Sequence, residues 1–141
     1  MAANTLVLTY DPKKVILTLG GTPINGYTDG TFVNVEGNAE TWIKKVGADG
    51  EVNRALSNDN THTITITLLQ TSLSNAYLKS VYEADKKTGL GMLPFTFTDL
   101  NDGETKFWPE VWVTKAPPKG RAKETTDTEW VIHTGQEADA A

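Results

Sequence analysis

The sequence has no cysteine and only two histidines among its 141 residues. Without cysteine, neither a disulfide framework nor a thiolate metal site can form. The two histidines, His62 and His133, are far apart in the chain, and neither has a second ligand at metal spacing. His62 also belongs to an apolar set of alternating residues, so we interpret it as a structural histidine. Stability must therefore come from packing or from assembly.

The chain also has few basic residues and no long apolar run. Its formal net charge is −5, which argues against gripping nucleic acid, because phosphate neutralisation needs a basic face. The apolar run at residues 6–8 lacks a basic leader and is too short for a signal peptide. No stretch approaches a membrane-spanning length. We expect a soluble protein made in the cytoplasm, with no stable membrane association.

Turn-forming residues recur at short intervals, with runs rich in Val, Ile, Thr and aromatic residues between them. This pattern is typical of a mainly β fold with short strands, a small β-barrel or rolled sandwich. We expect a single domain over residues 1–141, with flexible ends at about 1–12 and 134–141. The predicted strands are residues 14–19, 31–36, 51–56, 61–70, 94–99, 105–115 and 128–134. A hairpin closed at Gly103 is predicted between residues 99 and 104.

The clearest pattern is an alternation of threonine with His62, Ile64, Ile66 and Leu68. Successive side chains of a strand point to opposite faces, so the threonines form one wet face and the other residues a mainly dry one. A uniform hydroxyl face has no arrangement of acid, base and nucleophile. The pattern favours a structural protein over an enzyme. The threonines of this face are Thr61, Thr63, Thr65 and Thr67.

One segment follows the period of a helix instead. A helix is predicted from about Ser74 to Lys87, with the Ser74 hydroxyl as its cap, a hydrophobic staple of Leu73 and Leu78, and Gly89 as its stop. Packing against the barrel is the expected role, and binding of a partner is the alternative.

Residues 37–56 form a long connection that places Trp42 and Ile43 beside the basic residues Lys44, Lys45 and Arg54. One interpretation is an ordinary hairpin whose tryptophan folds back on the core. The other is an arm that docks on a neighbouring subunit, because an aromatic side chain beside basic ones is typical of interfaces.

A search for catalytic, cofactor or metal sites yields none. The carboxylates mostly occupy turns, where they accept backbone hydrogen bonds, and Gly20-Gly21 is followed by neither a lysine nor a helix, as a phosphate cradle requires. Trp108 and Trp112 lie at strand spacing on a face with charged residues, opposite Phe107, Val111 and Val113. The tryptophan face is either covered by the helix or open to a partner, which leaves a carbohydrate-binding β-sandwich as the alternative function.

The order of several blocks resembles the tail tube proteins of contractile-tailed bacteriophages. These blocks are GYTDGTFVNVE at 26–36, VGADGEVNRALSNDNTHTITITLLQTSLSN at 46–75, TGLGMLPF at 88–95 and EW at 129–130. The resemblance implies a small β-barrel with one flanking helix, similar to the tube subunits of type VI secretion. A virion tube, a tail-like bacteriocin tube and a secretion tube would use the same subunit.

The resemblance also implies assembly and partners. Subunits would join in hexameric rings that stack into a hollow tube inside a contractile sheath, and DNA would pass through without specific binding. The partners would be further copies of the chain, the sheath protein, the terminator and baseplate or initiator proteins. The location would be the virion tail, assembled in the host bacterial cytoplasm. Trp42, Lys44, Lys45 and Arg54 are the candidates for ring stacking, and Thr61, Thr63, Thr65 and Thr67 for the lumen wall.

Overall fold

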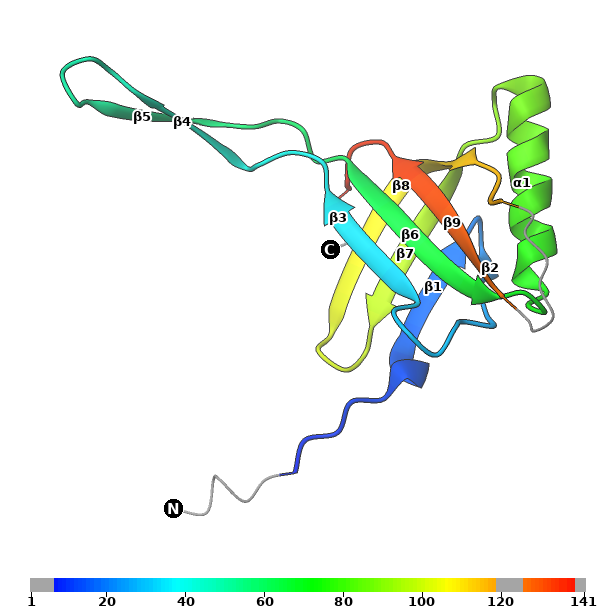
Figure 1. Cartoon of the computed structure of the whole chain (residues 1–141). Coiled ribbons are helices and arrows are strands. Elements are labelled where there is room, and N and C mark those ends of the chain that lie inside the picture. Colours follow the sequence, from blue (N-terminus) through cyan, green and yellow to red (C-terminus); the bar gives the residue numbers. More distant parts are fainter. Residues whose placement is uncertain (1–6, 119–125, 139–141) are drawn as a thin grey trace.

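The computed structural model describes residues 7–118 and 126–138 as a rolled, all-antiparallel sheet with one α-helix beside it (Figure 1). The strand order in the sheet is β2-β1-β7-β8-β9-β6-β3, and β4 and β5 form a separate hairpin. The strands are β1 (Val15–Leu19), β2 (Thr22–Pro23), β3 (Val33–Gly37), β4 (Trp42–Val46), β5 (Val52–Leu56), β6 (His62–Leu69), β7 (Leu93–Asp99), β8 (Glu104–Lys115) and β9 (Asp127–Thr134). The helix is α1 (Ser74–Thr88), and a short 3-10 turn at Pro12–Lys14 precedes β1.

The mainly β fold with a single flanking helix, expected from the sequence, is confirmed. Each predicted strand is present with bounds shifted by at most two residues, whereas β2 and β4 were not predicted. The hairpin between β7 and β8 is also confirmed, with Gly103 at φ 76°. The positive φ explains why glycine occupies this position.

The alternation in β6 produces the two faces expected of it. Ile64, Ile66 and Leu68 are fully buried, while Thr63, Thr65 and Thr67 lie half-buried on the outer side of the sheet. β6 pairs with β9 on one side and with β3 on the other, so it sits well inside the sheet. Its apolar side chains therefore join a core to which β1, β7, β8, β9 and α1 also contribute.

The prediction for Trp108 is wrong: its side chain is fully buried in the core. β8 contains one extra residue relative to β7, because Phe95 pairs with Trp108 while Leu93 pairs with Val111. Such a bulge reverses the alternation of side chains beyond it, and Pro109 within it has no N–H for the sheet ladder. Trp108 and Val111 consequently face the same interior. Two exposed tryptophans on one face, on which the sugar-binding alternative depended, are not present.

The predicted position of the helix is confirmed, but the predicted cap by the Ser74 hydroxyl is wrong. Leu78 and Val81 are buried against the barrel, and Gly89 ends the helix with φ 69°. The N-cap residue is Leu73, whose side chain is 90% exposed and so cannot form the expected staple. The Ser74 hydroxyl instead accepts a hydrogen bond from the backbone N–H of Asn25 at 2.9 Å. The hydroxyl ties the helix to a distant loop rather than capping its first turn.

Two aromatic side chains anchor α1 to the sheet. The Tyr77 hydroxyl donates to the carbonyl of Leu19 at 2.8 Å, and the Trp130 indole N–H donates to the Asn75 side-chain oxygen at 3.0 Å. Both bonds give a polar partner to an aromatic group that is otherwise packed in apolar surroundings. The helix is therefore fixed to β1 and to β9, which confirms packing against the barrel as a role.

The described parts of both chain ends make contacts with the barrel. The backbone N–H of Asp11 donates to Asn101 at 3.0 Å, next to the β7–β8 hairpin. Past β9, the N–H of Ala138 donates to the carbonyl of Phe107 at 2.9 Å and forms an isolated bridge. The ends were expected to be flexible, and residues 1–6 and 139–141 of those ranges lie outside the described residues.

The two faces of β6 generate a stability prediction. Ile66→Ala should lower the free energy of unfolding by about 2–5 kcal/mol, because it leaves a cavity in the core. Thr65→Ala, one residue away on the outer face, should lower the free energy of unfolding by less than about 1 kcal/mol. Urea unfolding followed by tryptophan fluorescence measures both variants. Equal losses, or a larger loss for Thr65→Ala, would contradict the assignment of the faces.

Candidate assembly interface

The β4–β5 hairpin stands away from the barrel as an arm (Figure 1). Within the described sheets its two strands pair only with each other, and every residue in them is exposed. The turn is closed by the N–H of Gly47, which donates to the carbonyl of Glu51 at 2.8 Å. Of the two interpretations of residues 37–56, the tryptophan folded back on its own core is wrong, because Trp42 lies on the arm with 45% of its surface exposed.

The arm presents one apolar and basic face. Residues directly opposite in an antiparallel pair point to the same side, and the register pairs Trp42 with Leu56, Lys44 with Arg54 and Val46 with Val52. The Arg54 guanidinium lies 3.9 Å from the centroid of the Trp42 ring, a cation–π contact. Lys44 and Arg54 are like charges on opposite strands, an arrangement that costs free energy within the arm alone. Lys45 lies on the other side, opposite Asn53.

The outer face of β6 continues over its neighbouring strands. One row of paired residues runs from Glu36 through Thr63 and His133 to Trp112, and the next joins Asn34, Thr65 and Val131. Thr67 pairs with Glu129. These rows include two carboxylates, Glu36 and Glu129, and one histidine, and the row through Val131 ends at Lys115. The structure thus combines the predicted threonines into a broad, polar surface with a net acidic character.

Thr61 lies just before β6 but still joins this group. Its hydroxyl accepts from the Asn38 amide at 3.0 Å, and the same amide's oxygen accepts from the Thr63 hydroxyl at 2.7 Å. Thr61 also donates to Asp59 at 2.6 Å, and its hydrogen bonds lower the pKa of that carboxyl. Asn38 thus holds the two threonines together at the base of the arm.

The rolled sheet does not close, because its two end strands, β2 and β3, do not pair with each other. The segment between them bridges the seam: Thr28 donates its N–H to the Thr67 carbonyl at 3.2 Å, and Thr67 donates to the Phe32 carbonyl at 2.9 Å. The Thr28 hydroxyl donates to Asp127 at 2.7 Å. These bonds hold the segment against β6 and leave the outer part of the seam open.

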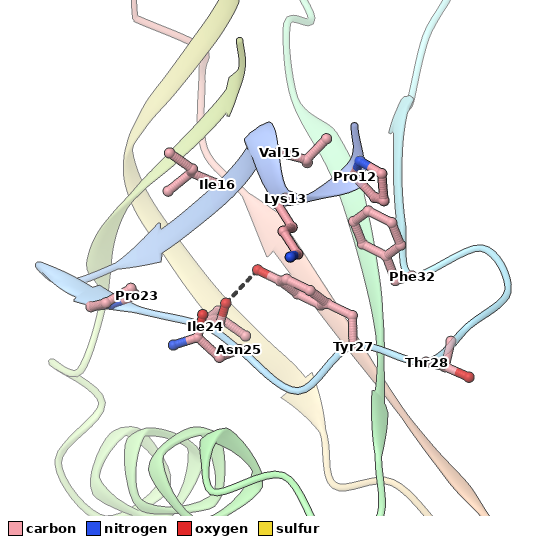
Figure 2. A pocket seen from close by; sticks show the side chains of 10 residues that line it. All are labelled: Pro12, Lys13, Val15, Ile16, Pro23, Ile24, Asn25, Tyr27, Thr28 and Phe32. Carbon is pink, nitrogen blue, oxygen red and sulfur yellow. Dashed lines mark hydrogen bonds between the residues drawn. The ribbon is translucent and has the colours of Figure 1, made fainter. Parts of the chain in front are cut away.

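Two hollows mark the seam. One, of about 400 Å³, lies between β1 and the bridging segment, where Figure 2 shows Tyr27 directing its hydroxyl to the Ile24 carbonyl. The second is a groove of about 740 Å³ at the start of β3. Pro12, Val15, Phe32, Val33 and Phe97 supply its apolar walls, and Asp29 and Asp99 are its charged residues. Sequence reasoning missed this groove, since alternation along single strands does not show where a sheet fails to close.

The histidines have structural surroundings. His62 Nδ1 lies 3.0 Å from the Asn60 carbonyl oxygen and 3.2 Å from the Trp108 indole nitrogen. His133 lies on the threonine surface. Among residues 7–118 and 126–138, no three His, Asp or Glu side chains are grouped closely enough to hold a metal ion. No helix in the described part of the chain is long and apolar enough to cross a membrane.

Two solved structures have a similar fold. A chain from the virion of a native gene transfer agent superimposes with a TM-score of 0.64 at 14% identity, covering 94% of this chain and 100% of that one. A chain from the sheath–tube complex of an extracellular contractile injection system, PVC, has a TM-score of 0.59 at 13% identity and covers 98% and 97%. At these identities the likeness establishes the shared fold.

The sequence comparisons identify the family. Residues 15–140 match the family described as bacteriophage PhiTE tail tube protein, and the chain belongs to it. The chain is also 26% identical over 132 residues to the structural protein ORF10 of Pseudomonas phage KPP10, covering 88% of this chain and 76% of that protein. The family resemblance predicted from the sequence is confirmed, and with it the role of a phage tail tube structural protein.

The bridging segment of the seam generates a prediction at alkaline pH. Burial raises the pKa of the Tyr27 phenol to about 12, although a backbone hydrogen bond from Leu17 opposes the rise. The unfolded chain loses this proton near pH 10, so stability should decline as the pH rises from about 10 to 12. Ultraviolet titration should show a late-ionising tyrosine component, and Tyr27→Phe should remove it. A late component that persists in the variant would disprove the assignment.

Proposed function

We propose that this chain is the repeating subunit of a tail tube, assembled as stacked hexameric rings that form a hollow conduit inside a contractile sheath. DNA passes through this conduit during ejection. The family membership supports the tube role, and the observation that carries the assembly is the β4–β5 arm. Val46, Val52 and Leu56 on it are each more than half exposed, and a contact with another subunit would bury them. The location is the virion tail, after synthesis in the host cytoplasm.

The sheet edges support side-by-side joining of subunits within a ring. Among the described residues β3 has a partner on one side only, and unpaired edges of this kind pair readily with further strands. In a closed ring, each edge can be covered by the next subunit, which also prevents uncontrolled aggregation. Partners beyond the ring are the sheath protein, the terminator and the baseplate or initiator proteins. PVC provides a precedent for a related fold within a sheath–tube complex.

The threonine surface is proposed as the lumen wall. Thr61, Thr63, Thr65 and Thr67 offer hydroxyl groups without positive charge, and Glu36 and Glu129 add negative charge beside them. Such a wall repels the phosphate backbone, so DNA finds no strong binding site on its way through.

The first experiment is negative-stain electron microscopy of the purified protein over a range of concentrations. Rings or hollow tubes of uniform width are expected. Particles that remain monomeric at every concentration, in light scattering as well, would contradict self-assembly.

The stacking role of the arm is tested by Trp42→Ala and Lys45→Glu. Both should shorten the tubes or abolish them while leaving the unfolding transition within about 0.5 kcal/mol of the wild type, since the arm lies outside the core. Lys79→Glu, the same charge change on the exposed side of α1, is the control and should leave tube length unchanged. Full-length tubes from both arm variants, or an unfolded monomer, would show that the arm has another role.

The lumen assignment is tested by Thr65→Cys, which introduces the only cysteine of the chain. In assembled tubes the thiol should react with a small maleimide but several-fold more slowly with a maleimide on a large polymer. Lys79→Cys provides an external reference that should react with both reagents. If Thr65→Cys and Lys79→Cys react equally with the large reagent, Thr65 does not face a narrow channel.

A further inference from the structure

We propose that the groove at the start of β3 receives the β4–β5 arm of a second copy of the chain. The proposal rests on the proposed tube assembly and names the acceptor of the stacking contact. The groove is the larger of the two hollows at the seam, at about 740 Å³, which is within the roughly 300–1,000 Å³ range of sites that enclose small ligands. A tryptophan side chain with its neighbours can fit a space of this size.

The arm and the groove lie at opposite ends of the same strand. β3 starts at Val33, which lines the groove, and ends at Gly37, from which the chain runs into the arm. Figure 1 shows the arm leaving the barrel away from the start of β3. A contact between two different surfaces at opposite ends of a molecule is heterologous, and it repeats along an axis where the rotation between copies does not close a ring. Head-to-tail stacking of this kind produces a tube.

The two surfaces are complementary in charge. The paired strands of the arm carry Lys44, Lys45 and Arg54, and the acidic residues Asp49 and Glu51 lie in the turn at its tip, whereas the chain as a whole has a net charge of −5. The groove contributes Asp29 and Asp99, and its described lining contains no basic residue. Opposite charges at a contact steer association and fix the register of the partners. The like charges of Lys44 and Arg54 would also be relieved by carboxylates between them.

The two surfaces are also complementary in polarity. Trp42, Val46, Val52 and Leu56 are exposed and share one face of the arm, and the groove walls are formed by proline, valine and phenylalanine side chains. Their contact would remove apolar surface from water on both sides. The chain's own segment from Val7 to Tyr10 is the competing occupant, because Val7 and Leu8 are exposed and Tyr10 already lines the groove.

Cross-linking tests the contact and leaves the charges intact. Val46→Cys on the arm and Thr31→Cys in the groove lining are combined in one chain, which has no other cysteine. A short bis-maleimide should convert this protein into a ladder of covalent multimers. The control chain, with Val46→Cys and Lys79→Cys, should give none. If wild-type tubes form but the Val46–Thr31 pair gives no ladder, or a link within one chain only, the groove assignment is wrong.

Charge reversal provides a second test. Lys44→Glu and Asp29→Lys should each reduce the yield of tubes at least about tenfold, because each places like charges together. The double variant should restore most of the yield. The matched control combines Lys44→Glu with Glu83→Lys on α1 and should not restore it. Rescue by both double variants, or by neither, would overturn the specific pairing.

The outcomes separate this inference from the tube proposal. Cross-linked ladders from the chain with Val46→Cys and Thr31→Cys, combined with a wild-type protein that forms no tubes in the microscope, would support the arm–groove contact and refute the tube. Tubes without ladders would support the tube and refute the groove as acceptor.

Discussion

The open seam of the rolled sheet is the constraint on which the rest of the structure depends. A β-sheet can remove its own edges only by closing, and here β2 and β3 end the sheet without meeting. Backbone N–H and C=O groups along such edges need partners. The bridging segment through Thr28 pairs instead with β6 beyond the start of β3, by a backbone bond to Thr67. The edge of β3 could therefore pair with a strand of a second molecule, as the proposed ring would require.

The incomplete barrel must nevertheless be rigid before it assembles. Its core is supplied by regular alternation, most clearly in β6, and is completed by the large side chains of Phe95 and Trp108. The helix closes the side away from the arm, where Tyr77 and Asn75 bond to the sheet. Rigidity here matters for function, because an arm rooted in a loose body would position its tryptophan poorly. The hydrogen bonds of Asn38 to Thr61 and Thr63 hold the root of that arm.

Much of this fold could be predicted from the sequence where one local signal dominates. β6 and α1 both form as their sequence periods predict, because each element buries one face in the core. The prediction failed at Trp108, where a bulge containing Pro109 reverses the alternation, and bulges are set by the register with another strand rather than by the strand itself. It also missed β4, which is exposed on both faces and so carries no hydrophobic period.

In the candidate site, too, some features could be predicted from short segments of sequence and others depend on the tertiary structure. The basic arm residues and the threonines could be selected from the sequence, because unusual chemistry marks them within short segments. The groove could not be predicted from the sequence. Its wall residues Pro12, Phe32 and Phe97 come from separate parts of the chain and lie together only in the rolled sheet. The cap of α1 failed for a related reason: the hydroxyl of Ser74 had a tertiary partner in Asn25. Local propensity is a weak guide where a distant backbone group competes for the same atom.

The charge distribution reconciles two demands on a tube subunit. A wall along which DNA slides should be neutral or acidic, yet acidic subunits repel one another when they stack. In the proposed tube, Lys44, Lys45 and Arg54 on an arm that stands away from the barrel would meet both demands. The attraction then acts over short distances at the contact between copies, while the surface with Glu36 and Glu129 keeps its sign. The same separation would allow a chain that is acidic overall to associate with itself, because such association depends on where its cations lie rather than on their number.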